Sequence, residues 1–121
     1  MTFPNINYKA TNTELDTELQ TLLEQKFTGL EKYLGTETDI KCDVEFDKVA
    51  PKQNGEVFRV EANLWLAGTL YRAEATEVNF ETAIDEVQAE LDKELRRAAD
   101  KQSTLMKRGG RRLKEMLRFG S

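Results

Sequence analysis

The spacing of apolar residues changes twice along this chain of 121 residues, and these changes limit the folds open to it. From residue 12 to residue 34, apolar side chains recur every three or four positions, which is typical of a helix with one buried face. From residue 39 to residue 76 they mostly alternate, as in strands that bury one face. From residue 80 to residue 98 the helical spacing returns. The sequence therefore predicts a helix, a group of strands and a second helix.

The first helix is predicted over residues 11–34. Asn12 or Thr13 can cap its start, and Gly35 can end it. Its apolar stripe consists of Leu15, Leu19, Leu22, Leu23, Phe27, Leu30 and Leu34. Such a stripe requires a partner surface, which the alternating segments can provide.

Four segments are predicted to be strands. Residues 3–10 alternate weakly and suit a short edge strand, and residues 39–47, 57–67 and 69–76 follow the first helix. Gly68 supplies a tight turn between the last two. The positions expected to face inward on the second and third strands are Ile40, Cys42, Val44, Phe46, Phe58, Val60, Ala62, Leu64 and Leu66.

The second helix is predicted to start after an Asn79 cap and to end near Gln102. Its apolar stripe consists of Phe80, Ile84, Val87, Leu91, Leu95 and Ala98. The order strand, helix, three strands, helix predicts an α+β domain, in which a four-stranded sheet carries both helices on one face. A right-handed crossover through the first helix would make the first two strands parallel and leave the others antiparallel.

Residue types that many active sites need are missing. The chain has no histidine, which removes catalytic triads, imidazole bases and the commonest metal ligand. Cys42 is the only cysteine, so no internal disulfide can form, which suits a reducing compartment. No apolar segment approaches the ~18 residues of a membrane span. We expect a cytoplasmic protein without enzymatic activity, metal, cofactor or small-molecule substrate.

Charge is segregated along the chain. Residues 1–92 hold 8 Lys or Arg and 19 Asp or Glu, a net charge of −11, whereas residues 93–121 hold 10 and 3, a net charge of +7. Within the second helix the basic residues opposite the apolar stripe are Lys93, Arg96, Arg97 and Lys101. Bases near a helix C-terminus also complement the helix macrodipole, so these four have an explanation that needs no ligand.

The macrodipole does not explain the basic residues beyond the expected helix end. These are Lys107, Arg108, Arg111, Arg112, Lys114 and Arg118. We expect residues 104–121 to form an extension of a domain at residues 1–103, either a tail or a short amphipathic helix after a break at Gly109 and Gly110. Three interpretations of this extension stay open: its charges are only solvated, it docks on the chain's own domain, or it binds a polyanion. The predominance of arginine favours phosphate, and therefore RNA over membrane.

Three stretches carry a resemblance to a known family: "KFTGLEKYL", "ANLWLAGTLYRAEA" and "NFETAIDEVQAELDKELRR". In this order and spacing, over residues 3–101, the chain resembles the bacterial ribosome hibernation-promoting factor family in its short form. The family is also called the ribosome-associated inhibitor or sigma-54 modulation protein family. The resemblance implies the same strand and helix order, similar to a double-stranded RNA-binding domain.

The resemblance also implies a function. Members dock on the small ribosomal subunit and its rRNA in the path of messenger and transfer RNA, which inhibits translation and protects idle ribosomes. The family's basic positions fall here on Lys26, Lys32, Lys93, Arg97 and Lys101. Off the ribosome we expect a monomer with no membrane partner. The pairing domain of long-form relatives is absent from this sequence, so we do not expect the chain to dimerise ribosomes by that route.

Some positions depart from the family pattern. Glu90 and Gly29 stand where lysine is frequent, and Glu81 takes a usual tyrosine position, so the domain offers fewer phosphate contacts than the pattern suggests. The full set expected to bind RNA is Lys26, Lys32, Lys93, Arg96, Arg97, Lys101, Lys107, Arg108, Arg111, Arg112, Lys114 and Arg118.

An alternative function is a protein-interaction module, which would use the acidic outer face of the sheet and the basic tail as a docking helix. Asp43, Glu45 and Asp47 line that face, and we interpret them as solvated side chains rather than as metal ligands. Trp65 and Tyr71 are expected to face outward too, either to cover each other or to stack on a base.

Overall fold

The alternating segments form one sheet, and the two periodic segments form helices that cover it. The computed structural model describes residues 5–49 and 57–120, and for residues 102–120 it describes the backbone alone. The elements are β1 (Ile6–Thr11), α1 (Thr17–Phe27), the 3-10 helix η1 (Thr28–Tyr33), β2 (Ile40–Lys48), β3 (Phe58–Leu66), β4 (Thr69–Glu77) and α2 (Phe80–Gly120). The predicted α+β fold and its element order are confirmed.

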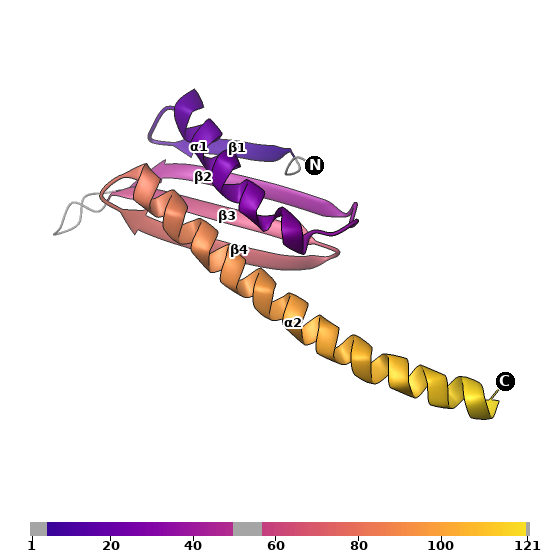
Figure 1. Ribbon diagram of the computed structural model, residues 1–121. Coiled ribbons are helices and arrows are strands. Elements are labelled where there is room, and N and C mark those ends of the chain that lie inside the picture. Colours follow the sequence, from indigo (N-terminus) through magenta and orange to yellow (C-terminus); the bar gives the residue numbers. More distant parts are fainter. Residues whose placement is uncertain (1–4, 50–56, 121) are drawn as a thin grey trace.

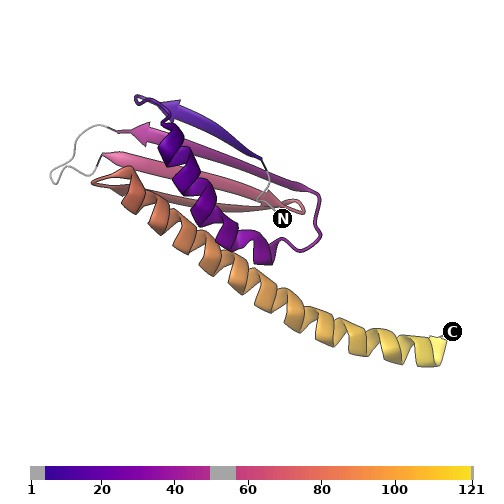
Figure 2. The same cartoon turned by 45° about the horizontal axis from the view of Figure 1, so that its top comes forward.

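The strands lie in the order β1-β2-β3-β4. β1 runs parallel to β2, with Tyr8 opposite Val44, whereas β2, β3 and β4 form an antiparallel meander, with Val44 opposite Ala62 and Ala62 opposite Ala73. Figures 1 and 2 show α1 and α2 on the same face of the sheet. Within residues 5–49 and 57–120, no helix covers the other face of the sheet, so its side chains lie toward solvent.

The core lies between the sheet and the helices. Its buried side chains are Leu23, Phe27, Leu30, Leu34, Cys42, Val44, Phe46, Val60, Ala62, Leu64, Ala73, Phe80, Ala83, Ile84, Val87, Leu91 and Leu95. Phe80, at the start of α2, meets Phe46 and Phe58 edge to face, at centroid distances of 5.3 and 5.0 Å. Because burial of one large apolar side chain is worth about 1.5–3 kcal/mol, these contacts fix α2 on the sheet.

The first helix begins later than the sequence predicts. Its cap is Asp16, whose Oδ1 accepts a hydrogen bond of 2.9 Å from the Glu18 backbone N–H, so the predicted cap at Asn12 or Thr13 is wrong. β1 stays paired with β2 as far as Thr11. Asn12 then adopts φ +58°, which turns the chain out of the strand. The residues after this turn bring the chain round to α1.

The C-terminal part of the first predicted helix is tighter than an α-helix. α1 ends at Phe27, and the chain continues as η1 to Tyr33. The hydroxyl of Thr28 donates to the Gln25 carbonyl at 2.6 Å, and Gly29 follows, so two poor helix formers stand together at the change. Gly35, with φ +57°, ends the segment as predicted.

The second helix is longer than the sequence predicts. Asn79 caps it as expected, because its Oδ1 accepts a 2.7 Å hydrogen bond from the Thr82 N–H. α2 then runs without interruption for 41 residues, so the predicted end near Gln102 and the break at Gly109 and Gly110 are wrong. A glycine costs a helix only about 1 kcal/mol, and most neighbouring residues favour a helix. The boundary at residue 103 stays a prediction, and α2 runs across it.

The β3–β4 hairpin sets which side chains face the core. Ala67 (φ +50°) and Gly68 (φ +84°) form its two-residue turn, with the positive φ angles that match the twist of a hairpin. This turn places Trp65 opposite Leu70 and Leu64 opposite Tyr71. Tyr71 therefore packs against the core, and the predicted outward pairing of Trp65 with Tyr71 is wrong.

Candidate nucleic-acid interface

The predicted RNA-binding side chains that the structure describes form two sets in the helical layer. At about 100° per residue, positions 93, 97 and 101 of α2 fall on one flank of the helix, toward β4. Arg96 lies about 60° around the helix from Lys93, on the side of Asp92, which η1 contacts. We call Lys93, Arg97 and Lys101 the outer row, and we call the line along which α2 meets α1 and η1 the seam. Lys26, Lys32 and Arg96 belong to the seam.

The outer row is exposed to solvent. Within the side chains that the structure describes, none of Lys93, Arg97 and Lys101 forms an ion pair or a hydrogen bond. Lys93 borders an open hollow of about 610 Å³ between α2 and the edge strand β4, together with Arg72 and Glu90. Three cations at successive turns of one helix flank, without partners among the described side chains, can contact the phosphates of a nucleic acid.

The seam cations, by contrast, lie near carboxylates of α2. Lys26 Nζ lies 3.1 Å from Asp85 Oδ1, and Lys32 Nζ lies 4.0 Å from Asp92 Oδ1. Arg96, one turn after Asp92 in the same helix, places Nη1 3.8 Å from its Oδ2. The two lysine pairs connect α1 and η1 to α2, in addition to the apolar contacts beneath them, whereas the Arg96 pair lies within α2.

Tyr33 completes the group around Asp92. Its hydroxyl donates a hydrogen bond of 3.0 Å to Asp92 Oδ1, and its ring lies 5.2 Å from Lys32 Nζ. Lys32 and Arg96 keep 67% and 61% of their side-chain surface exposed, whereas Asp92 keeps 25%. The anion is therefore the shielded member, and both cations face solvent. Exposed pairs of this kind are worth about 0.2–1 kcal/mol, so other anions can compete for the cations.

The departures from the family pattern also fall on the helices. Glu90 is exposed on the same flank as the outer row, and Glu81 is exposed in the first turn of α2. Gly29, in η1, lies against α2, where an added Cβ would sit 3.6 Å from Gln88 Nε2. The acidic side chain at position 90 lowers the positive potential beside Lys93.

Six predicted RNA-binding residues cannot be placed. The side chains of Lys107, Arg108, Arg111, Arg112, Lys114 and Arg118 lie outside the described residues, although the backbone that carries them is helical. Figure 1 shows this part of α2 running beyond the edge of the sheet. Their contribution to RNA binding stays a prediction.

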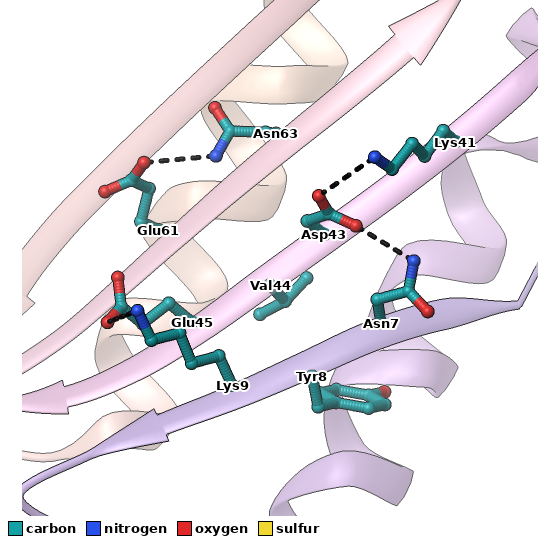
Figure 3. Close-up of a pocket in the computed structure, with 9 residues that line it drawn as sticks. All are labelled: Asn7, Tyr8, Lys9, Lys41, Asp43, Val44, Glu45, Glu61 and Asn63. Carbon is teal, nitrogen blue, oxygen red and sulfur yellow. Dashed lines mark hydrogen bonds and ion pairs between the residues drawn. The ribbon is translucent and has the colours of Figure 1, made fainter.

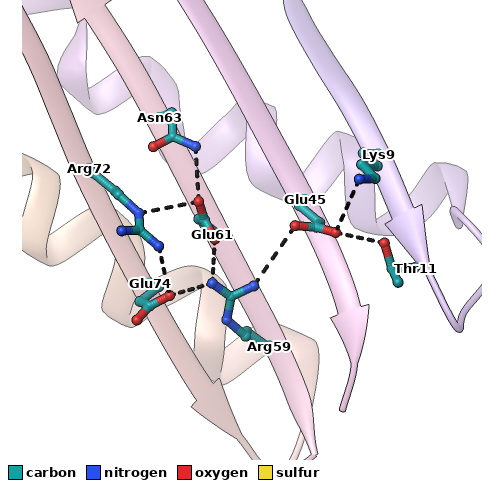
Figure 4. Close-up of polar contacts among 8 residues, drawn as sticks. All are labelled: Lys9, Thr11, Glu45, Arg59, Glu61, Asn63, Arg72 and Glu74. Carbon is teal, nitrogen blue, oxygen red and sulfur yellow. Dashed lines mark hydrogen bonds and ion pairs between the residues drawn. The ribbon is translucent and has the colours of Figure 1, made fainter.

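The uncovered face of the sheet carries a network of ion pairs (Figure 4). Arg59 contacts Glu45 at 3.9 Å and also bonds Glu61 and Glu74, so one guanidinium joins carboxylates of three strands. Arg72 contacts Glu61 at 3.2 Å and Glu74 at 3.4 Å. Burial alone would raise the pKa of Glu61, but hydrogen bonds from Asn63, Arg59 and Arg72 lower it to about 2.

A shallow hollow of about 370 Å³ lies beside this network, over β1, β2 and β3 (Figure 3). There Asn7 donates to Asp43 at 3.0 Å, and Lys41 lies 3.8 Å from the same carboxylate. Lys41 also lies 5.1 Å from the centre of the Trp65 ring. Four acids of this face, Asp43, Glu45, Glu61 and Glu74, thus have basic or amide neighbours, which leaves less net charge to attract a basic protein. Among the described side chains, Asp47 Oδ1 is buried without a hydrogen-bond partner. The alternative function loses its main support.

The described part of the chain holds neither a cluster of metal-ligating side chains nor a reactive cysteine. Within residues 5–49 and 57–101, no three His, Cys, Asp or Glu side chains converge as metal ligands would. Burial, with a smaller effect from Asp43, raises the pKa of the Cys42 thiol to about 12, so this cysteine stays a protonated core residue. No helix in the described part is apolar enough over a sufficient length to cross a membrane.

Tyr33, Asp85 and Asp92 were not identified as site residues from the sequence. The only sequence signal is position: both aspartates lie on the α2 flank about 100° from the apolar stripe, where a neighbouring helix can reach them. Recognising them requires the contacts of α1 and η1 with α2, which only the folded structure provides.

The chain has recognisable relatives. A family model described as sigma 54 modulation protein / S30EA ribosomal protein matches residues 6–103, which confirms the resemblance in the sequence. A search of curated proteins found no match.

Two solved structures share the fold. The N-terminal domain of Protein Y from Thermus thermophilus superposes with a TM-score of 0.63 at 23% identity, over 77% of this chain and 97% of that one. A ribosomal subunit interface protein from Coxiella burnetii gives a TM-score of 0.61 at 20% identity, over 78% and 97%. Since the family match spans most of the sheet and the helical layer, the chain belongs to the sigma 54 modulation protein / S30EA ribosomal protein family.

Proposed function

We propose that this protein binds rRNA of the small ribosomal subunit in the path of messenger and transfer RNA, inhibits translation and protects idle ribosomes. Membership in a family of ribosome-associated modulation proteins supports a ribosomal partner. So does the Coxiella burnetii neighbour, which is described as a ribosomal subunit interface protein. We further propose that the protein works in the cytoplasm, without catalysis, and is monomeric away from the ribosome.

The observation that carries the proposal is the outer row. Lys93, Arg97 and Lys101 are exposed, lie at successive turns and have no internal partner within the described side chains. When a protein cation neutralises an RNA phosphate, counterions leave the RNA and the affinity rises. A cation that has no anion partner in the protein can do this without breaking an ion pair. The seam cations Lys32 and Arg96 supply further charge at a second position on the helical layer.

Binding of this kind depends strongly on salt. If about five to eight cations contact phosphates, the logarithm of the affinity should fall against the logarithm of the salt concentration with a slope of roughly −4 to −7. Neutralising the outer row should remove about three contacts and reduce the slope by about 2 to 3.

Co-sedimentation with purified bacterial small ribosomal subunits across a salt series tests the proposal. The variant carries Lys93→Gln, Arg97→Gln and Lys101→Gln, which remove three charges without altering the buried stripe of α2. We expect about a tenfold or greater loss of affinity at low salt and a shallower slope.

A matched control removes three charges from the sheet instead. Lys9→Gln, Lys41→Gln and Lys48→Gln change exposed residues away from the outer row and the seam. The control should bind nearly as the wild type does. Equal losses of affinity in the two triple variants would contradict the proposal that the outer row, rather than the sheet, contacts RNA. Wild-type protein that does not sediment with subunits at low salt would contradict the proposed function.

A further inference from the structure

We propose that Tyr33 and Asp92 are positioning residues, which hold Lys32 and Arg96 together so that the two cations bind one backbone phosphate of the RNA. This inference rests on the proposed function and assigns a specific contact to the seam. We call these four residues the seam cluster. Lys32 and Arg96 come from different elements, η1 and α2, and the Asp92 carboxylate is the group that they share.

The geometry keeps both cations available. Lys32 lies 4.0 Å from one Asp92 oxygen and Arg96 lies 3.8 Å from the other, distances at the outer limit of an ion pair. A close ion pair is shorter, at about 2.7–2.9 Å. Each cation is therefore oriented by the carboxylate without a close ion pair to it, so its other N–H groups can bind a second anion.

The contacts of Tyr33 account for the long distance between Lys32 and Asp92. Its hydroxyl donates to Asp92 Oδ1 at 3.0 Å, the same oxygen that Lys32 faces, and so uses part of the acceptor capacity of that atom. The Tyr33 ring lies 5.2 Å from Lys32 Nζ and provides a second contact to it, a cation–π contact. Tyr33 itself packs against the core, which fixes both contacts relative to α2.

The charges of the seam cluster suit a phosphate. Two cations and one shielded anion leave a local charge of +1, which matches the single negative charge of a phosphodiester. Arg96 can present two parallel N–H donors to the phosphate oxygens, and Lys32 can add a compact charge from the neighbouring element. A phosphate bound here would contact η1 and α2 together, so this contact also fixes the orientation of the domain on RNA.

Tyr33→Phe tests the inference because it removes one hydroxyl and no charge. Without the hydroxyl, Asp92 has a free acceptor for Lys32, and the lysine should pair more closely with it than with RNA. Sedimentation with bacterial small subunits at low salt should show affinity that is about three- to tenfold weaker. Tyr8→Phe is the matched control, since it removes a hydroxyl that donates to the Gln20 carbonyl at 3.4 Å, away from the seam cluster.

A double-mutant cycle separates positioning from a general effect on the fold. In a Lys32→Gln/Arg96→Gln background, Tyr33→Phe should have almost no further effect on affinity, because the cations that it positions are absent. Unchanged affinity for Tyr33→Phe in the wild-type background would overturn the inference, and so would an equal loss in both backgrounds. Failure of the wild-type protein to bind subunits would instead overturn the proposed function, and the inference with it.

Discussion

At the scale of single residues, Glu61 shows how the uncovered face of the sheet stabilises the fold. Its carboxylate accepts hydrogen bonds from the Asn63 amide at 3.1 Å and from Arg72 at 3.2 Å, and it also bonds Arg59. Only 16% of its side chain is exposed, so these partners substitute for water. A half-buried carboxylate in such a network stabilises the folded state only while it stays ionised.

The pKa of Glu61 predicts a loss of stability in acid. Because the folded-state pKa is lowered from 4.5 to about 2, this contribution is complete above pH 4.5 and disappears as the pH falls toward 2. Urea unfolding at pH values between 7 and 2 measures it as the difference between wild type and Glu61→Gln. That difference should shrink as the pH falls through this window. A difference that is constant with pH would contradict the assignment.

Ala67 is strained by its place in the hairpin. It adopts φ +50°, a region that side chains with a Cβ enter at a cost of about 1–2 kcal/mol, while its N–H donates to the Asp39 carbonyl at 2.9 Å. Ala67→Asn would create the Asn-Gly pair that such turns favour. The free energy of unfolding should rise by about 0.5–1 kcal/mol, measured by urea denaturation. Ala67→Val, with a branched Cβ, should lower it, and the opposite order would contradict the turn geometry.

At the scale of elements, the strands were easier to predict than the helix ends. Alternation over residues 39–47 and 57–67 predicted β2 and β3 to within a residue or so, because one face of each is buried and the other is polar. Helix ends depend on weaker local effects. Asp16 rather than Asn12 caps α1 because β1 first completes its pairing with β2, which is a long-range contact.

α2 is continuous through Gly109 and Gly110, so substitutions there test whether binding to subunits depends on a helical C-terminal part. Gly109→Ala/Gly110→Ala should increase the helical circular dichroism signal and keep or raise the affinity for subunits, because each alanine favours the helix by about 1 kcal/mol. Gly109→Pro should interrupt the helix and weaken binding. If Gly109→Pro binds as tightly as the wild type, the extension acts as a flexible segment instead.

At the scale of the whole molecule, the topology followed from the sequence but only part of the site did. The basic residues were identifiable from their type and helical phase, which are local properties. Tyr33 and Asp92 are 59 positions apart and meet only because η1 packs on α2. The prediction that Tyr71 faces outward failed for a similar reason, since the two-residue turn at Ala67 and Gly68 sets the pairing of β4.

A chain that ends at Ser103 measures what the extension adds. The described core lies within residues 23–95, so the shortened protein should keep its unfolding midpoint to within a few degrees. It loses six basic residues and one acidic residue. Its affinity for subunits should fall, and its salt slope should become shallower by up to about 5, if all six cations contact phosphates. If the shortened chain and the full chain bind subunits with equal affinity, the extension does not contact RNA.

The uninterrupted helix also affects how the molecule approaches a partner. Residues 80–120 form one helix about 60 Å long, and it leaves the sheet at the end that carries the positive charge. While the helix stays uninterrupted, this end cannot fold back onto the acidic body. The protein therefore has a large permanent electric dipole, which would turn it in the field of a polyanion so that the basic end arrives first. The continuity and the charge distribution of α2 together thus set the orientation of the molecule during diffusion, before any contact forms.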